Sequence, residues 1–345
     1  MNPPVLLTRR IPSPVLARLR EACAVDLYDA GDAIPHQELV DRVRGKQALL
    51  CLLTDRVDRE VLEAGSGLRI VANIAVGYDN IDVAAARELG IPVSNTPDVL
   101  TEATAELTWA LILAATRRIA EGDRLLRRGA WQGWALDFML GMELRGKQLG
   151  IVGLGRIGRA VAARAPAFGM RVAACDAGPI DRLPAARRES PTAGRGPDIE
   201  MMPLDRLLAT SDVVSLHVPL TPETRHLIDR AALARMKRCA CLVNTARGPV
   251  VDEAALAWAL GERLIAGAAL DVYEQEPRVH PGLLGLENVV LAPHLGSATT
   301  ETRTAMAALA VDNVLAVLGG GQPLTAVGEG AGASHDNRAI GGFAR

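Results

Sequence analysis

Residues 148–176 decide the fold, and they read QLGIVGLGRIGRAVAARAPAFGMRVAACD. An apolar run precedes a GxGxxG pattern of Gly153, Gly155 and Gly158, and a helical pattern follows it. In a strand–turn–helix unit of this kind, the first glycine permits the tight turn, the second lets the backbone approach a pyrophosphate, and the third allows close packing of helix on strand. The stretch therefore predicts a dinucleotide site at the amino end of a helix.

The next strand predicted along the chain ends at Asp176. An acidic side chain about 20 residues beyond the glycine pattern accepts hydrogen bonds from the adenosine ribose and repels a 2′-phosphate, so Asp176 favours NAD over NADP. Two alternatives stay open. In the first, Asp176 only caps a turn. In the second, an arginine of the following loop (Arg182, Arg187 or Arg188) binds the phosphate of NADP.

Short apolar runs alternate with helical patterns along most of the chain, which predicts parallel strands joined by crossover helices. The predicted strands are 5–7, 48–53, 70–74, 92–94, 148–152, 171–175, 213–216, 241–244, 266–270 and 289–291. The predicted helices are 14–22, 36–43, 58–64, 81–89, 101–118, 159–168 and 298–318, the last with Met306, Leu309, Val314 and Leu315 on its apolar side. The fold class is α/β, with two doubly wound parallel-sheet domains.

Two segments show no clean periodicity. Residues 177–203 hold five prolines and four arginines, and we interpret them as a solvated surface loop. Residues 321–345 are rich in Gly and Ala, and we expect a flexible tail there.

Composition excludes several classes of protein. Lys and Arg number 38 against 40 for Asp and Glu, and the chain holds only three Phe, four Trp and three Tyr. This balance disfavours binding to nucleic acid or to anionic membranes, and the longest apolar run, 109–115, is well short of the ~20 residues that span a bilayer. The five cysteines lack CxxC spacing, so we expect no metal site. With no signal-peptide pattern at the start, the prediction is a cytoplasmic globular protein.

Charged residues follow three predicted strands: Arg247 after the first, an acidic cluster after the second, and His294 after the third. Carboxyl ends of parallel strands meet at one edge, where ligands bind. Reduction of a keto acid needs a cation for the substrate, a histidine as proton donor, and a carboxylate that favours the imidazolium. In the cluster, Asp271, Glu274 and Glu276 all stay open as that carboxylate. The simpler alternatives are a surface charge, helix or turn caps, and a structural histidine.

Five further segments carry a family resemblance: VGYDNID at 76–82, NTPDVL at 95–100, NTARG at 244–248, DVYEQEP at 271–277 and PHLGS at 293–297. Together with the glycine pattern, they resemble the D-isomer-specific 2-hydroxyacid dehydrogenases of the glyoxylate/hydroxypyruvate reductase group, from about residue 5 to residue 319. The resemblance implies that the catalytic residues are Arg247, Glu276 and His294. Substrate contacts are expected from Leu53, the N–H groups of Val76 and Gly77, Arg247 and Ser297.

The resemblance also implies the cofactor contacts, with NADH preferred and NADPH as an alternative. They are Thr104, Gly153, Gly155, Arg156, Ile157, Gly158, Asp176, His217, Val218, Pro219, Thr245, Ala246, Asp271 and Gly296. For His217, which also follows a strand, the residues themselves favour a structural role.

The implied domains are not consecutive halves of the chain. A flavodoxin-like substrate domain, 1–98 and 296–320, is interrupted by a Rossmann cofactor domain, 99–295. A homodimer is also implied, with the region of Trp131, Trp134 and Phe138 reaching to the partner. The alternative places these aromatic residues in the local core.

The predicted activity is reversible reduction of a small 2-oxo acid, glyoxylate or hydroxypyruvate, to the D-2-hydroxy acid. The proton comes from His294 and the hydride from the nicotinamide. The enzyme alternatives are a 2-ketogluconate-type reductase and a phosphoglycerate dehydrogenase. A third alternative is an NAD(H)-sensing binding protein or corepressor without turnover, which the complete set of Arg247, Glu276 and His294 disfavours.

Overall fold

The computed structural model describes residues 2–177 and 198–328 of the 345-residue chain. They divide into two compact units. The five-stranded unit comprises residues 2–100 and 297–328, and the seven-stranded unit comprises 101–177 and 198–296. The units thus join at Leu100–Thr101 and Gly296–Ser297, where the sequence places the joins at 98–99 and 295–296.

The sheet of the five-stranded unit is entirely parallel. Its strands are β1 (Pro4–Leu7), β2 (Ala24–Leu27), β3 (Ala48–Cys51), β4 (Ile70–Asn73) and β5 (Val93–Ser94). Their order, β2-β1-β3-β4-β5, is that of flavodoxin-like proteins. β1, β3 and β4 are buried, as expected for strands covered on both faces, whereas β2 is an edge strand that the sequence analysis missed.

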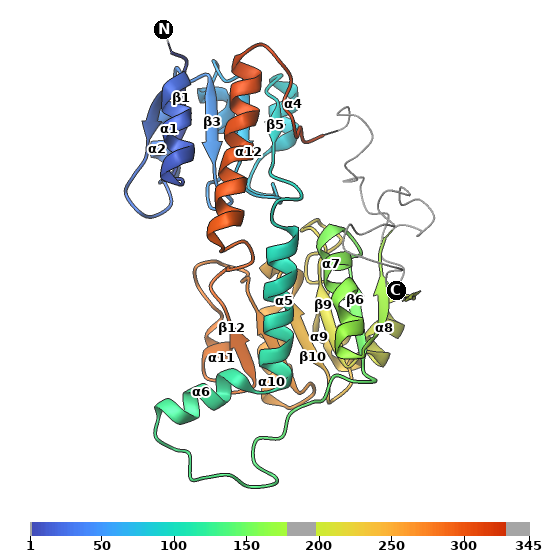
Figure 1. Ribbon diagram of the computed structural model, residues 1–345. Helices are drawn as coiled ribbons and strands as arrows, with labels where there is room; N and C mark the ends of the chain where they lie inside the picture. Colours follow the sequence, from blue (N-terminus) through green and yellow to red (C-terminus); the bar gives the residue numbers. More distant parts are fainter. Residues whose placement is uncertain (1, 178–197, 329–345) are drawn as a thin grey trace. The chain divides into compact units, whose positions relative to one another are not determined.

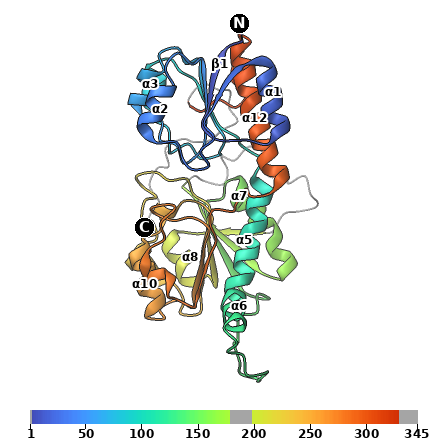
Figure 2. The same ribbon diagram turned by 90° about the vertical axis from the view of Figure 1, so that its left-hand side faces the viewer.

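Helices cover both faces of this sheet (Figures 1 and 2). One layer holds α1 (Ser13–Ala22) and α12 (Thr300–Leu318), and the other holds α2 (His36–Arg42), α3 (Arg59–Ala64) and α4 (Val83–Glu88). α12 comes last in the unit, and it packs against β3, β4 and α1.

The structure corrects two expectations for the end of this unit. α12 buries Val311 and Val317, whereas Leu309 and Leu315 are only partly buried, because the helix packs along a slightly rotated stripe. Residues 321–328 are no flexible tail. Ala326 bridges to Ser94, and the Asn313 side chain bonds Thr325, so an extended segment without periodicity still finds partners. The rest of the expected tail, 329–345, lies outside the described residues.

The sheet of the seven-stranded unit is also entirely parallel. Its strands are β6 (Gln148–Val152), β7 (Arg171–Cys175), β8 (Ile199–Met201), β9 (Val213–Leu216), β10 (Cys241–Asn244), β11 (Gly267–Leu270) and β12 (Val289–Leu291). The order β12-β11-β10-β9-β6-β7-β8 is the Rossmann order with one further strand. The order reverses between β6 and β9, and a crevice for ligands forms at such a switch point.

Two helix layers sandwich this sheet (Figure 2). On one face lie α5 (Thr101–Thr116) and α7 (Arg156–Arg164), which pack against each other. The other face carries α8 (Leu204–Thr210), α9 (Arg230–Arg235), α10 (Glu253–Gly261) and α11 (Pro281–Leu284). Trp109 of α5 is buried and stacks on Phe168, so it belongs to the core of this unit, unlike the exposed Trp131 and Trp134.

β8 corrects the interpretation of residues 177–203 as a loop throughout. It is an edge strand that pairs only with β7 and stays partly exposed, so its sequence lacks a continuous apolar run. The remainder of that segment, 178–197, lies outside the described residues, as do Arg182, Arg187 and Arg188.

The predicted fold class, two doubly wound parallel sheets with helices on both faces, is confirmed. Within the described ranges, the helices are too short or too polar for any of them to cross a membrane.

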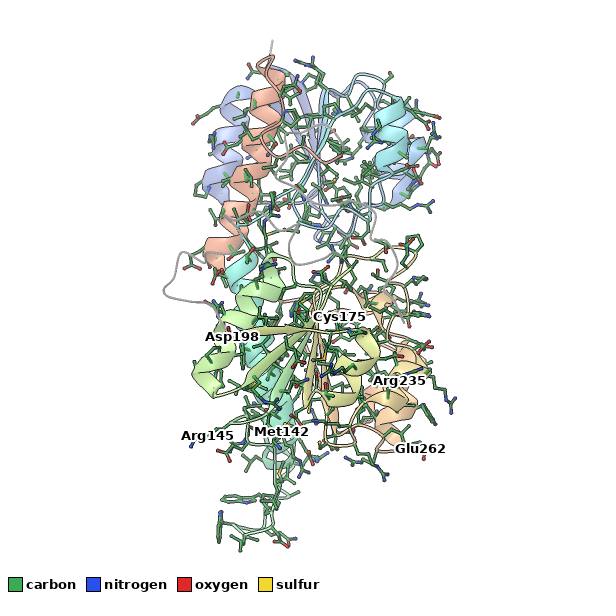
Figure 3. The ribbon with its side chains drawn as sticks, turned by 90° about the vertical axis from the view of Figure 1, so that its right-hand side faces the viewer. Met142, Arg145, Cys175, Asp198, Arg235 and Glu262 are labelled. Carbon is green, nitrogen blue, oxygen red and sulfur yellow. The ribbon has the colours of Figure 1, made fainter. Side chains whose placement is uncertain are left out.

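Between α6 (Ile119–Arg127) and β6, the chain exposes apolar side chains. α6 buries none of its residues. Figure 3 labels Met142 and Arg145 at the end of this segment next to the sheet, and the side chains before them extend away from the unit. We call residues 130–140 the exposed strip; its large apolar members are Trp131, Trp134, Leu136, Phe138 and Leu140.

Candidate active site

The glycine loop lies between β6 and α7, and its three glycines serve different needs. Gly153 has a φ of +94°, and a Cβ there would lie 2.7 Å from the His217 carbonyl carbon. At Gly158, a Cβ would lie 2.1 Å from the Gly153 oxygen. Gly155 is exposed, and a Cβ there would meet nothing within 4 Å. The protein itself thus requires the first and third glycines, while the second leaves open space at the helix N-terminus where a pyrophosphate fits.

Asp176 follows β7 directly and is exposed. Its carboxylate accepts the N–H of Leu154 in the glycine loop, at 2.7 Å, and the N–H of Ala177, also at 2.7 Å. Asp176 therefore braces the glycine loop, a role that the sequence analysis did not predict. A carboxylate has about four acceptor positions, so these two bonds leave room for ribose hydroxyls.

Arg247 lies just beyond β10 at the carboxyl edge of the sheet. The turn that carries it is shaped by Asn244, whose side chain accepts the Ala246 N–H at 3.0 Å and donates to the Arg247 carbonyl at 2.9 Å. The guanidinium donates to the Ala246 carbonyl at 2.8 Å. The positive charge of Arg247 also helps to lower the pKa of Glu276, so the loop after β10 interacts electrostatically with the loop after β11.

His294 and Glu276 come together at the same edge. His294 Nδ1 lies 2.8 Å from Glu276 Oε2, and Glu276 Oε1 accepts the Tyr273 N–H at 3.0 Å. Burial alone would raise the pKa of Glu276, but the hydrogen bond and charge of His294, helped by Tyr273 and Arg247, hold it below its ordinary value. Glu276 is therefore ionised near neutral pH, and it leaves His294 Nε2 as the nitrogen available to a reactant.

Asp271, at the end of β11, shapes the loop that carries the histidine. Its carboxylate accepts the N–H groups of Leu295, at 2.6 Å, and Gly296, at 2.8 Å, while its carbonyl accepts that of His294. His294 has a φ of +54°, in the left-handed region. Burial raises the pKa of Asp271, and the two N–H bonds partly offset that effect. Asp271 thus positions the loop that carries His294 through hydrogen bonds to its backbone.

The acidic cluster divides between two histidines. Glu274 Oε2 lies 2.9 Å from Nε2 of His226, whereas Glu276 pairs with His294. The geometry thus selects Glu276 from the three carboxylates that the sequence left open. The carboxylates of Glu274 and Glu253 each accept the backbone N–H of the other residue. The sequence analysis missed Glu253, because an acidic residue is common in the first turn of a helix and does not indicate a site.

The other expected cofactor residues surround the glycine loop or the adjoining strand ends. His217, Val218 and Pro219 follow β9, and the Nε2 of His217 lies 2.9 Å from Ser215 Oγ. Burial lowers the pKa of His217 to about 3, so its ring is neutral near pH 7. Arg156 and Ile157 open α7, and Ala246 lies in the turn after β10.

Two buried threonines of α5 connect it to the site loops. Thr104 Oγ1 donates to the Gly296 carbonyl at 3.2 Å, and Thr108 Oγ1 lies 2.9 Å from Thr245 Oγ1. Of the expected site residues, the seven-stranded unit holds the catalytic set and the cofactor set, and the five-stranded unit holds Leu53, Val76, Gly77 and Ser297.

In the five-stranded unit, three asparagines organise the carboxyl edge. Asn95 Nδ2 donates to the Val76 carbonyl at 2.8 Å, and Asn73 Nδ2 donates to the Gly77 carbonyl at 2.8 Å. Asn80 Nδ2 donates to the Leu52 carbonyl at 3.0 Å. These bonds hold the backbone of 76–77 by its carbonyls, and the N–H groups of both residues have no acceptor within the described part of this unit.

A parallel sheet in Rossmann order with this glycine loop, and with an Arg, a Glu and a His at one carboxyl edge, defines the class of NAD(P)-dependent dehydrogenases. A family model described as D-isomer specific 2-hydroxyacid dehydrogenase, NAD binding domain, matches residues 109–296.

Relatives match over nearly the full length. The glyoxylate reductase of Thermofilum pendens is 50% identical over 326 residues, 93% of each chain. That of Korarchaeum cryptofilum is 51% identical over 319 residues, 92% of this chain and 93% of the relative. The chain belongs to the D-isomer-specific 2-hydroxyacid dehydrogenase family, and the resemblance seen in its sequence is confirmed.

Solved structures agree. The glyoxylate reductase from Paecilomyes thermophila is 34% identical with a TM-score of 0.83, covering 95% of this chain and 99% of that one. An NADPH-dependent glyoxylate/hydroxypyruvate reductase from Sinorhizobium meliloti, in complex with NADP and malonate, is also 34% identical, with a TM-score of 0.81 over 95% and 97% of the two chains. The protein is thus an NAD(P)-dependent dehydrogenase.

Proposed function

We propose that the protein reduces glyoxylate or hydroxypyruvate to the corresponding 2-hydroxy acid, of D configuration where the product is chiral. The observation that carries this proposal is the 2.8 Å pair of His294 and Glu276 beside Arg247, at the edge that also bears the glycine loop. Relatives of this chain are named glyoxylate reductase or glyoxylate/hydroxypyruvate reductase, which supports small 2-oxo acids as the substrate class.

Each catalytic residue has one task in the proposed reaction. When bound, the reduced nicotinamide supplies a hydride to the carbonyl carbon of the substrate. His294, as imidazolium, donates its Nε2 proton to the carbonyl oxygen, and Glu276 orients the ring through Nδ1. The Arg247 guanidinium orients the carboxylate and the carbonyl. In the reverse direction, His294 accepts the hydroxyl proton.

The substrate carboxylate is assigned to the N–H groups of Val76 and Gly77. The carbonyls of these two residues accept hydrogen bonds from Asn95 and Asn73, which fix the backbone there. Because the backbone is fixed, the two N–H groups keep a constant direction, as an anion site requires. Leu53 and Ser297 complete the proposed contacts. In this proposal, the five-stranded unit binds substrate and the seven-stranded unit binds the dinucleotide.

A panel of 2-oxo acids, run with NADH and with NADPH, tests the proposed activity. We expect oxidation of the cofactor with glyoxylate and hydroxypyruvate, and weaker turnover with 2-ketogluconate and 3-phosphohydroxypyruvate. NADH binding without turnover on any substrate would instead favour a sensor.

The same proposal holds that NADH is the preferred cofactor, because the exposed Asp176 carboxylate repels a 2′-phosphate. We expect Asp176→Ser to raise KM for NADH by ~10-fold and to narrow the preference over NADPH, since a charged acceptor for the ribose hydroxyls is lost. Steady-state kinetics with both cofactors measure this effect. An unchanged preference would leave Asp176 with its bracing role alone.

We further propose a homodimer in which the exposed strip contacts a second copy. Trp134 is 81% and Leu136 82% exposed, and several large apolar side chains exposed along one short segment support an interaction site there. Light scattering after gel filtration should give twice the chain mass, and Trp134→Glu with Leu136→Glu should shift the mass toward one chain. Leu284→Glu, at a leucine outside the strip that is 64% exposed, is the control. A cytoplasmic location stays a prediction of the sequence.

A further inference from the structure

Glu253 is an acidic residue in an unusual place. It opens α10, where an acidic side chain ordinarily extends into water, yet only 4% of it is exposed. Its carboxylate accepts the Glu274 N–H at 2.7 Å with one oxygen and the His280 N–H at 3.2 Å with the other. Both oxygens are thus committed to the backbone of the loop after β11.

The contact is reciprocal. The carboxylate of Glu274 accepts the N–H of Glu253 at 2.9 Å, so each glutamate binds the backbone of the other. The second oxygen of Glu274 lies 2.9 Å from His226 Nε2. We call this reciprocal pair of Glu253 and Glu274 the carboxylate clamp.

The clamp joins the loops that carry two of the proposed catalytic residues. Glu253 follows Arg247 after one short 3₁₀ turn, Gly248–Val250. In that turn, a Cβ on Gly248 would lie 1.9 Å from the Tyr273 carbonyl carbon, so the two backbones touch. On the other loop, the N–H groups that Glu253 accepts, those of Glu274 and His280, stand on either side of Glu276.

We propose that Glu253 is a positioning residue for the reaction: through the carboxylate clamp, it holds the turn of Glu276 at both ends and so fixes the Glu276 carboxylate against His294. This inference rests on the role of Glu276 in the proposed function. The side chain of Glu253 makes its bonds to backbone only, and it acts on the reactants through Glu276.

Loss of the clamp releases two backbone donors and lets the turn shift. A misplacement of about 1 Å in a reacting group lowers turnover by up to ~10²-fold, so we expect kcat of Glu253→Ala to fall by ~10- to 100-fold. Glu253→Gln keeps one acceptor oxygen, and its kcat should lie between those of the wild type and Glu253→Ala. The dissociation constant for NADH should stay within about twofold, because the glycine loop is untouched.

A double-mutant cycle with Glu276→Gln separates positioning from general structural damage. If Glu253 acts through Glu276, Glu253→Ala in the Glu276→Gln background should lower kcat by less than about threefold further. Losses that multiply in the double variant would overturn the inference, as would a folded Glu253→Ala with normal kcat. If Glu253→Ala does not fold, the same cycle with Glu253→Gln decides between these outcomes.

Two further measurements keep the failures apart. Glu276→Gln with normal kcat would overturn the proposed role of Glu276 and the positioning role with it, whereas a low kcat that is independent of Glu253 overturns positioning alone. Glu262→Gln is the matched control: this glutamate caps the other end of α10 and lies at the surface (Figure 3), so its kcat and NADH affinity should equal those of the wild type.

Discussion

Two histidine–glutamate pairs share one loop of the seven-stranded unit. His294 pairs with Glu276 at 2.8 Å, and His226 pairs with Glu274 at 2.9 Å. Both histidines have a left-handed backbone, with φ of +54° and +49°, and all four side chains are between one-fifth and two-fifths exposed. By distance, burial and backbone shape, the two pairs are nearly equal.

They differ in what surrounds them. The charge of Arg247 acts on Glu276, whose pKa is lowered, and its partner His294 lies in the loop just beyond β12, at the carboxyl edge. The other carboxylate oxygen of Glu274 accepts the Glu253 N–H at the start of α10. The backbone N–H of His226 donates to the Pro249 carbonyl. The comparison teaches that a close His–carboxylate pair does not by itself indicate catalysis; the strand end and the neighbouring charges decide.

Replacing each histidine should separate the pairs most strongly. We expect His294→Ala to lower kcat by at least ~10²-fold, because the general acid is lost. His226→Ala should leave kcat within about threefold of the wild type, since that ring makes no proton transfer in the proposed reaction. Steady-state reduction of glyoxylate gives kcat for both variants. Similar losses in the two would contradict a catalytic role for the His294 pair alone.

The carboxylate of the first pair should hold the proton donor in place. Glu276→Gln keeps the size of the side chain but removes the charged oxygen that contacts His294 Nδ1, so kcat at neutral pH should fall by ~10-fold or more. Steady-state reduction of glyoxylate measures the loss. A kcat equal to that of the wild type would show that Glu276 does not act on the proton donor.

The lowered pKa of Glu276 also has a consequence for stability. A carboxyl group whose pKa is lower in the folded protein stabilises the fold above its ordinary pKa, and this stabilisation is lost as the pH falls through the folded value. The difference in unfolding free energy between the wild type and Glu276→Gln should therefore shrink as the pH falls from neutral to below the ordinary pKa of a glutamate, as measured by denaturant titration.

Gly248 lies beside the loop that both pairs share. Because an alanine Cβ would lie 1.9 Å from the Tyr273 carbonyl carbon, Gly248→Ala should push that loop away and lower the unfolding free energy by ~1–3 kcal/mol. Gly155→Ala, where a Cβ meets nothing, is the control and should keep the stability while weakening NADH binding. Equal stabilities of the two variants would contradict the close backbone contact.

The smallest effect is expected from the second pair itself. The His226 side chain is 40% exposed, so the ion pair with Glu274 is partly screened, and His226→Ala should lower the unfolding free energy by less than ~1 kcal/mol. A loss of several kcal/mol would mean that His226 supports the carboxylate clamp more than its exposure indicates. Denaturant titration at fixed pH measures it.

The sequence predicted the strands that have short apolar runs and missed β2 and β8, two edge strands without one. β6 and β7 lie where their apolar runs predict them, because strands covered on both faces need continuous apolar residues. β2 and β8 each pair with one neighbour and stay partly exposed, so they leave no such run.

Site residues divide in the same way. Arg247 and His294 follow strands and could be found from that position, whereas the choice between Glu274 and Glu276 depends on how the loop folds back, which spacing along the chain does not define. Glu253 could not be found, because its partners are backbone N–H groups 21 and 27 residues further along the chain, beyond β11.

The interrupted chain of the five-stranded unit has a consequence for protein synthesis. β3 and β4 leave the ribosome early, but α12, which covers them, is translated only after the whole seven-stranded unit. During translation, the part of the first sheet that α12 covers therefore stays exposed, while the second unit already has all the residues it needs to fold. The first unit to begin is the last to be completed, and a nascent chain stalled before residue 300 exposes an apolar sheet face to chaperones.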